Sequence, residues 1–482
     1  MKTLLTLNRF ILWTVLYGSL AGSMALFAQG GNLHEQSEIY VAPKDPLVQE
    51  KLKVWGNQKF GMLIHWGVYA VPGIIESWQI CSEPWLERPE GISYNDYKKW
   101  YWNLSSVFNP VNFDPDQWAE AAADAGMRYV VFTTKHHDGF NMFDTQQTDY
   151  KITNGPFKNH PKANVAKYVF EAFRDKDFMI GAYFSKPDWH NQDFWWDKYA
   201  TPDRNVNYDI RKYPEKWKSF QDFTYNQISE LMHDYGAIDI LWLDGGWVRP
   251  RETVTDEVRA WGAPIPEFSQ EINMPRIAEM AREAQPGIIF ADRTVHGPYE
   301  NYQTPERKIP DTKLDHPWET CMTLGNNWGY VPNDNFKTSA KVIHSLVEVV
   351  AKGGNMLLGV GPQPDGLLPP DALPILAEIG DWLELNSEAI YGTHALDTYQ
   401  DGNTWFTAND KETFAITLLE EGKEVPKSIS WSGNLPKKGS TLRLVSTGQK
   451  LNYTLNGNTV SVQIPSEIRK NARAALAFSF KN

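Results

Sequence analysis

The chain has 482 residues, which is room for one large domain and a smaller second module. Its formal net charge of −12 argues against binding nucleic acid or an anionic membrane surface through the overall field of the protein. With two cysteines, Cys81 and Cys321, it is not a small scaffold held together by disulfides. We expect two buried free thiols; a single long-range bridge in an oxidising compartment is the alternative.

Residues 1–28 have the pattern of a secretory signal peptide. Lys2 and Arg9 give a basic start, residues 10–27 are mostly apolar, and Ala28 precedes the expected cleavage point, with Ala25 as an alternative. An uncleaved membrane anchor is the competing interpretation; no later stretch is apolar and long enough to cross a bilayer. We therefore expect a secreted protein of the bacterial periplasm.

The next segment, 29–46, is polar and contains proline, and it predicts an extended N-terminal arm. Between residues 47 and 390, short apolar runs alternate with amphipathic segments. The predicted strands are 60–67, 127–137, 178–185, 238–246, 287–294 and 355–362. Predicted helices include 114–126, which opens with an Asp-Pro pair, and 220–236; both end at glycine.

Buried strands that alternate with helices favour a parallel sheet. The number of such units favours a (β/α)8-type barrel over an open doubly wound sheet. Since no glycine-rich nucleotide loop follows any strand, a dinucleotide- or ATP-binding fold is disfavoured.

From residue 391 to 482 the apolar residues recur with a period of two. Residues 451–455 alternate, Asn456 and Gly457 predict a tight turn, and residues 460–464 alternate again. The pattern predicts a small antiparallel β-sandwich as a C-terminal domain. We expect this domain to act as a packing module, with carbohydrate binding as the alternative.

Polar and aromatic residues gather at the carboxyl ends of the predicted strands, which is where β/α barrels carry their working residues. The groups are His65 and Trp66, then 135–138, 183–189, Asp244 and Arg293. A buried strand gains nothing from charges in its middle, so this clustering predicts a site.

The run Lys135-His136-His137-Asp138 is compatible with a metal, a base or a polar ligand. Adjacent residues on a strand point to opposite faces, so we do not expect both histidines on one metal. The chain also lacks the HxH and HExxH spacings of zinc sites, and we predict no metal and no cofactor.

A sugar suits this run better than a metal does. A neutral imidazole donates from one nitrogen and accepts on the other, as a sugar hydroxyl does. The aromatic content of 13%, with 20 tryptophans, suits the same ligand because flat rings pack on apolar faces.

Asp244 follows the apolar run 240–243, which contains Trp242, and precedes two glycines. A carboxylate at the end of a buried strand is costly unless it is paired or functional. The competing interpretation is a turn former, since Asp-Gly is common in turns.

A retaining glycosidase needs two carboxylates about 5–5.5 Å apart, one as nucleophile and one as acid/base. A cation such as Arg293 would keep the nucleophile ionised. Glu300, Glu306 and Glu319 are the candidates for the second carboxylate, and spacing alone leaves the choice open.

These stretches resemble the α-L-fucosidases of glycoside hydrolase family 29 over residues 48–390, and more loosely over the C-terminal region. The matching stretches are 60–72, 133–140, 240–246, 291–294, 317–330 and 353–366. The resemblance implies a retaining exo-glycosidase that removes terminal α-L-fucose from oligosaccharides or glycoconjugates by a two-step displacement. We expect no nucleic acid or membrane partner, and the oligomeric state is not predicted.

The resemblance also implies residue roles. Asp244 matches the nucleophile and Glu306 the acid/base, with Glu300 as the second choice. The predicted substrate-binding residues are His65, Trp78, His136, His137, Tyr183, Trp242 and Arg293. Family members often have Ser-Glu-Trp where this chain has Glu76-Ser77-Trp78, so a carboxylate contact to the sugar is either lost or supplied by Glu76. The aromatic loop 186–199 is expected to shape the aglycone side or the pocket for the C5 substituent.

Three other functions are alternatives. A glycosidase of the same family could act on a β-galactoside or an L-galactoside, which a polar group in the C6 pocket would favour. A non-catalytic sugar-binding barrel would lack one of the carboxylates. A metal-dependent hydrolase would be inactivated by a chelator.

Overall fold

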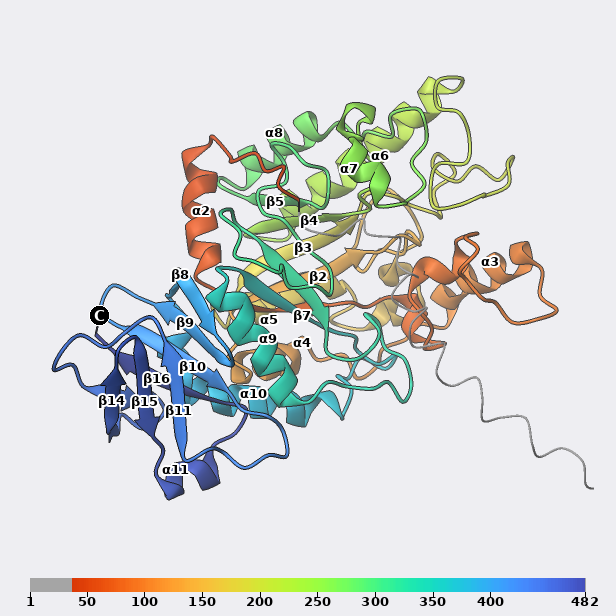
Figure 1. Cartoon of the computed structure of the whole chain (residues 1–482). Coiled ribbons are helices and arrows are strands. Elements are labelled where there is room, and N and C mark those ends of the chain that lie inside the picture. Colours follow the sequence, from red (N-terminus) through yellow and green to blue (C-terminus); the bar gives the residue numbers. More distant parts are fainter. Residues whose placement is uncertain (1–36, 482) are drawn as a thin grey trace, which may run out of the picture.

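The computed structural model describes residues 37–481 (Figure 1). The predicted signal peptide and the first part of the predicted arm lie outside the described residues. The rest of the arm contacts the barrel: the Ser37 backbone N donates to Gln303 Oε1 at 3.0 Å, and the Tyr40 hydroxyl donates to the Asn301 carbonyl at 2.9 Å.

Seven strands form a parallel sheet in the order β5-β4-β3-β2-β1-β7-β6. Every residue in these strands is buried, as expected for a sheet covered on both faces. The strands are β1 (Phe60–Ile64), β2 (Tyr129–Lys135), β3 (Met179–Ser185), β4 (Ile240–Asp244), β5 (Ile289–Asp292), β6 (Glu319–Thr323) and β7 (Asn355–Val360).

All six predicted strands of this sheet are present. The sequence does not predict β6, because its residues Glu-Thr-Cys-Met-Thr lack the apolar run that marks the others.

Helices surround the sheet (Figure 1). They are α2 (Pro46–Gly56), α3 (Tyr94–Trp102), α4 (Pro115–Asp124), α5 (Val165–Arg174), α6 (Pro214–Asp234), α7 (Asp256–Ala260), α8 (Met274–Ala284), α9 (Ser339–Ala351) and α10 (Ala372–Asn386). The helix α3 projects away from the strands instead of covering them (Figure 1). The helix α4 begins as predicted, with the Asp114 side chain accepting from the Asp116 backbone N at 3.3 Å. The helix α6 begins six residues earlier than predicted because Pro214 occupies its first turn, where a proline is well tolerated.

The segment 300–306 lies between the two edge strands of the sheet. Its first residue, Glu300, bridges to Ala291 of β5, and further along Gln303 bridges to Trp318 and Glu306 to Cys321 of β6. The predicted barrel-type fold is therefore confirmed, with seven strands and this irregular segment in the place of an eighth.

Two antiparallel sheets follow α10. A six-stranded sheet has the order β13-β12-β16-β10-β9-β8, and a three-stranded sheet has the order β11-β15-β14. The elements are β8 (His394–Asp401), β9 (Thr404–Ala408), β10 (Thr413–Leu418), β11 (Ser428–Ser432), β12 (Leu442–Leu444), β13 (Lys450–Leu451), β14 (Tyr453–Asn456), β15 (Thr459–Gln463), α11 (Ser466–Asn471) and β16 (Ala475–Phe480).

The predicted hairpin in this region is present, but its turn is one residue later than expected. Asn456 pairs with Thr459, so the turn residues are Gly457 and Asn458. Gly457 has φ 61°, a left-handed conformation that glycine adopts without a steric cost.

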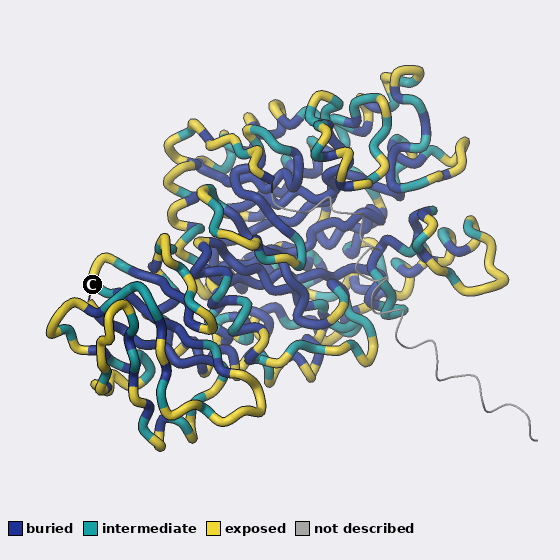
Figure 2. Tube along the Cα trace, in the orientation of Figure 1, coloured by how far each residue is buried: buried dark blue, intermediate teal, exposed yellow. Residues whose placement is uncertain are grey.

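The six-stranded sheet packs against the barrel helices, and Figure 2 shows buried chain running through both regions. The Trp382 indole of α10 donates to the Ala475 carbonyl at 3.1 Å. In the same contact, His344 Nε2 of α9 lies 2.9 Å from the Ala474 carbonyl. Phe414 and Ile416 belong to the same apolar core cluster as the barrel strands.

The structure also bears on the two cysteines and on membrane-spanning segments. Cys81 and Cys321 are both buried free thiols, as expected. Within residues 37–481, no helix combines the length and the apolar character needed to cross a bilayer.

Candidate active site

A pocket opens at the carboxyl ends of the barrel strands, with an empty volume of about 440 Å³ that includes its open mouth. All nine residues that the sequence predicts for the site line it. The full lining is Leu63, His65, Glu76, Trp78, His136, His137, Tyr183, Trp242, Asp244, Trp247, Arg293, Glu306 and Trp328.

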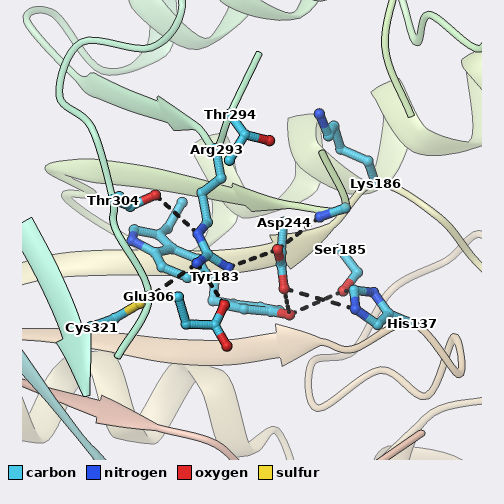
Figure 3. A network of polar contacts seen from close by, with 12 residues as sticks. His137, Tyr183, Ser185, Lys186, Asp244, Arg293, Thr294, Thr304, Glu306 and Cys321 are labelled. Atoms are coloured by element: carbon cyan, nitrogen blue, oxygen red, sulfur yellow. Dashed lines mark hydrogen bonds and ion pairs between the residues drawn. The ribbon is translucent and has the colours of Figure 1, made fainter. Parts of the chain in front are cut away.

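Asp244 ends β4 and receives hydrogen bonds from three directions (Figure 3). Its Oδ1 accepts from the Gly245 backbone N at 2.8 Å and from Arg293 NH1 at 2.9 Å. Its Oδ2 accepts from the Tyr183 hydroxyl at 2.7 Å. A carboxylate with three donors, one of them cationic, is favoured in its ionised form.

The two glycines after Asp244 are required by close packing. Gly245 has φ 91°, and a Cβ there would lie 2.4 Å from Pro187 Cδ. A Cβ on Gly246 would lie 2.0 Å from Thr294 Oγ1. Side chains at either position would displace the loops on both sides of the carboxylate.

Arg293 joins the two predicted catalytic carboxylates. NH1 donates to Asp244, and NH2 donates to Glu306 Oε2 at 3.0 Å (Figure 3). Nε donates to Thr304 Oγ1 at 3.0 Å, and the guanidinium lies 4.3 Å from the centre of the Trp242 ring. Burial disfavours its charge, but the neighbouring acidic groups outweigh that effect and raise the pKa of Arg293.

Glu306 is held between Arg293 and Trp328, whose indole donates to Oε1 at 3.3 Å. The backbone N of Trp328 donates in turn to Glu76 Oε1 at 3.1 Å. Burial raises the pKa of Glu76 to about 7, and Glu306 adds to that rise. Glu76 is therefore a third carboxyl group in the pocket lining.

The other two candidates for the second carboxylate do not line the pocket. Glu300 accepts from the Thr294 backbone N at 3.0 Å and pairs with His296 Nδ1 at 2.7 Å. Glu319 lies inside the barrel, where it accepts from the Tyr129 hydroxyl at 2.8 Å and the Trp242 indole at 3.1 Å. Burial raises the pKa of Glu319 to about 7.

The two adjacent histidines lie on the same side of the chain, contrary to the expectation of opposite faces. β2 ends at Lys135, so neither His136 nor His137 obeys the alternation of a strand. Their ring centres are 4.1 Å apart, and both line the pocket.

Each pocket histidine has one ring nitrogen engaged by a hydroxyl. Nδ1 of His65, His136 and His137 lies 2.8, 2.5 and 2.9 Å from the hydroxyls of Tyr69, Ser77 and Ser185 respectively. Burial lowers the pKa of all three imidazoles, that of His137 to about 3. A neutral imidazole whose Nδ1 is engaged keeps Nε2 to donate to or accept from a ligand hydroxyl, according to its tautomer.

His136, His137 and Asp244 also form a group that could hold a metal ion, since their ligand atoms lie within 4.8 Å of one another. Since the Ser77 and Ser185 hydroxyls engage the Nδ1 atoms of the two histidines, a metal would take their Nε2 atoms together with Asp244. It would then lie beside the Arg293 guanidinium that donates to Asp244 Oδ1, and this positive charge opposes the binding of a cation.

Lys135 and Asp138 lie behind the histidines and do not line the pocket. Lys135 Nζ is 3.3 Å from Asp188 Oδ2, and Asp138 Oδ2 accepts from the Tyr101 hydroxyl at 2.7 Å. Asp188 caps the turn at 190–191, and the next residue, Trp189, donates its backbone N to the His137 carbonyl at 2.8 Å. These contacts connect Lys135 to the His137 backbone through Asp188 and Trp189.

The sequence did not single out three lining residues: Leu63, Trp247 and Trp328. Trp247 follows Asp244 by three positions, and Trp328 falls in the matched stretch 317–330, so both carried a signal. Leu63 has the apolar character of any buried strand residue, and nothing distinguishes it in the sequence.

Comparison with known proteins agrees with this geometry. The family model described as alpha-L-fucosidase matches residues 27–388. Plasma alpha-L-fucosidase of Homo sapiens is 28% identical over 457 residues, covering 87% of this chain and 87% of that protein. Tissue alpha-L-fucosidase of Mus musculus is 29% identical over 396 residues, covering 76% of this chain and 78% of that protein.

Solved structures give the same result. Alpha-L-fucosidase isoenzyme 1 from Paenibacillus thiaminolyticus has a TM-score of 0.72 and 29% identity, covering 90% of this chain and 99% of that chain. The fucose complex of Thermotoga maritima alpha-fucosidase has a TM-score of 0.68 at 24% identity, covering 90% of this chain and 98% of that chain, and it supports the fold alone. The family match over most of the chain shows that this protein belongs to the α-L-fucosidase family of glycoside hydrolases, family 29.

Proposed function

We propose that this protein is an exo-acting, retaining α-L-fucosidase in which Asp244 is the nucleophile and Glu306 the acid/base. The observation that carries the proposal is the shared guanidinium: Arg293 donates to Asp244 at 2.9 Å and to Glu306 at 3.0 Å at one pocket. One guanidinium can bridge two carboxylates at the separation of about 5–5.5 Å that retention requires.

In the first step, Asp244 attacks the anomeric carbon as the bond from that carbon to the leaving oxygen breaks. Glu306 gives its proton to the leaving oxygen, and the sugar becomes covalently bound to Asp244. In the second step, Glu306 takes a proton from water as the water oxygen attacks the same carbon and Asp244 leaves. Two inversions give net retention.

The charges in the pocket support this division of roles. Asp244 has the Arg293, Tyr183 and Gly245 donors, which favour the ionised nucleophile. Glu306 shares the same arginine with Asp244 and lies near Glu76, so a proton on Glu306 relieves the repulsion among the three carboxyl groups.

The pocket also supports exo action on a single terminal sugar. Its lining residues come from the ends of several barrel strands and are buried, among them Leu63 and Trp242. Three neutral imidazoles with one nitrogen engaged offer the other nitrogen to sugar hydroxyls. Fucosylated oligosaccharides or glycoconjugates are the substrates that the relatives' names suggest.

The direct test replaces the nucleophile. Asp244→Gly should reduce kcat for an aryl α-L-fucoside by about 10³-fold or more, and added azide should restore turnover by attacking the vacated face. Asp209→Gly, a change at a partly buried loop carboxylate that does not line the pocket, is the matched control. Unchanged activity in Asp244→Gly, or a first product of inverted configuration by NMR, would refute the mechanism.

We also propose that the protein is exported and that residues 1–28 are removed. The support is the basic start, the apolar run and the small residue before the expected cleavage point. When the full chain is expressed in a bacterium with a periplasm, the mature protein in the periplasmic fraction should begin at Gln29. An intact Met1 in the membrane fraction would contradict this proposal.

A further inference from the structure

A buried ion pair lies directly behind one wall of the pocket. Arg204 Nε and NH2 donate to the two oxygens of Glu83, each at 2.5 Å. The side chains are 2% and 6% exposed. Burial works against the charge of Glu83, but Arg204 outweighs that effect and lowers the pKa of Glu83. Neither residue lines the pocket, and the mechanism above uses neither.

The guanidinium of Arg204 packs against two tryptophans that do line the pocket. It lies 4.7 Å from the centre of the Trp78 ring and 5.2 Å from that of Trp247. The centres of the two indoles are 5.5 Å apart. A desolvated guanidinium near aromatic rings is held by cation–π attraction, which depends on its position relative to each ring.

The backbone of Arg204 adds two further contacts to the same wall. Its carbonyl accepts from the indoles of Trp189 and Trp247, both at 3.2 Å. The rings of Trp78, Trp189 and Trp247 surround His137, with centre-to-centre distances of 5.3, 5.2 and 5.1 Å. Arg204 therefore contacts each of the three rings that pack on the histidine beside Asp244.

The pair also links loops that are far apart in the sequence. Glu83 follows β1, Arg204 follows β3 and Trp247 follows β4. A buried ion pair contributes little net stability compared with an apolar pair of the same volume, whereas its two parallel hydrogen bonds set a narrow geometry. Stability alone therefore does not account for its place behind the wall.

We propose that Arg204, oriented by Glu83, is a positioning residue that sets the aromatic wall of Trp78 and Trp247 and thereby the affinity of the pocket for the sugar ring. The proposal rests on the proposed glycosidase function and adds a residue that acts through others. Replacing Arg204 should therefore weaken sugar binding by the tryptophan wall, whereas Asp244 and Glu306 should keep their contacts with Arg293 and with them the rate of the chemical step.

The charge of Arg204 has a second effect, on His137. Arg204 helps to lower the pKa of His137, so that removing this charge should raise it. A protonated His137 would attract Asp244 Oδ2, which lies 3.8 Å away. The charged or titratable groups that face His137 are His65, His136, Arg204, Asp244 and Arg293.

The experiment measures kcat and KM for an aryl α-L-fucoside and the affinity for L-fucose by calorimetry, in the full chain. Arg204→Met should raise KM and weaken L-fucose binding by about tenfold, with kcat changed by less than about threefold. Arg204→Lys should not restore either value, because an ammonium cannot donate two parallel hydrogen bonds to Glu83. The acid limb of kcat/KM should move to higher pH in Arg204→Met.

A double variant separates positioning from stability. In Arg204→Met/Glu83→Met no buried charge is left unpaired, so the thermal stability lost in the single variant should return while KM stays high. Arg211→Met is the matched control, since Arg211 lies in the same loop in an exposed pair with Asp209 and should leave KM unchanged.

Two results would overturn the proposal. One is wild-type KM in the double variant; the other is an equal loss of kcat and kcat/KM in Arg204→Met. Failure of the proposed function looks different, because the wild-type protein would then neither hydrolyse the aryl α-L-fucoside nor bind L-fucose.

Discussion

At the scale of single residues, the choice of acid/base depends on where each carboxyl group finds its partners. Glu306 contacts Arg293 and Trp328 in the pocket lining. Glu300 is engaged by His296 and a backbone N–H, and Glu319 by two aromatic donors inside the barrel. Of these three carboxyl groups, only Glu306 lines the pocket.

Glu306→Ala should therefore depend on the leaving group. Substrates with poor leaving groups need protonation and should lose about 10²–10⁴-fold in kcat/KM, whereas an activated aryl fucoside should lose far less. Glu300→Ala is the matched comparison and should show no such dependence. Equal losses on both substrates in Glu306→Ala would move the assignment to another carboxyl group.

The raised pKa of Glu319 predicts how the stability of the protein depends on pH. Its pKa is about 7 in the fold against 4.5 for the free group, so the folded state binds more protons between these values. The wild-type protein therefore loses stability from this group as the pH rises from about 4.5 to about 7. Glu319→Gln has no such group, and its melting temperature relative to wild type should increase across this window. A constant difference would contradict the raised pKa.

The contacts of His136, His137 and Asp244 predict how the protein responds to a chelator. Because Arg293 is hydrogen-bonded to Asp244 Oδ1, a divalent cation beside His136 and His137 would face a positive charge already in place. We expect kcat/KM to be unchanged after dialysis against EDTA. Loss of activity that zinc restores would support the alternative of a metal-dependent hydrolase.

At the scale of elements, the segment 300–306 matters because it joins β5 to β6 and carries Glu306. Asn301 holds it in place: its backbone N donates to the Phe290 carbonyl, and its Oδ1 accepts from the Phe290 backbone N, both at 2.8 Å. Asn301 thus makes the two hydrogen bonds with the Phe290 backbone that a neighbouring strand would otherwise make at the edge of β5.

Asn301→Ala should leave the buried N–H of Phe290 without its acceptor and lower the free energy of unfolding by about 1–3 kcal/mol. Since Glu306 lies in the same segment, kcat/KM for substrates with poor leaving groups should fall as well. Asn335→Ala, at an exposed loop position, is the control. Denaturant unfolding and steady-state kinetics on both variants test the link; a destabilised Asn301→Ala with wild-type kinetics would break it.

At the scale of the whole molecule, the six-stranded C-terminal sheet shares a core with the barrel. Trp405, Phe414, Ile416, Ala475 and Ala477 belong to the apolar cluster that includes the barrel strands. Lys352 at the end of α9 lies 5.5 Å from the centre of the Trp405 ring. The six-stranded sheet thus covers an apolar surface of α9 and α10.

Ending the chain at residue 390 should expose that surface, so the truncated protein should aggregate or melt well below the full chain. The full chain should unfold in one calorimetric transition, because the two regions bury apolar area against each other. A soluble truncated protein with the melting temperature of the full chain would show that the regions are energetically independent.

The sequence by itself determined the strands and most of the site. Six strands of the parallel sheet were predicted from their apolar runs. The nine predicted site residues line one pocket because the carboxyl ends of parallel strands lie at the same edge of the sheet. The sequence does not predict β6, because β6 is buried between neighbouring elements although its own residues are mostly polar.

Only the tertiary structure decided the relations that depend on distance. The end of β2 at Lys135 brings both histidines to one side, which local alternation forbids. Glu306 is distinguished from Glu300 and Glu319 by its place in the pocket lining beside Arg293, and Arg204 is held by Glu83, 121 positions earlier. The pattern of apolar residues along an element predicts which of its faces is buried. Which polar atoms form hydrogen bonds depends on how distant elements pack together, and no single stretch of the chain specifies that packing.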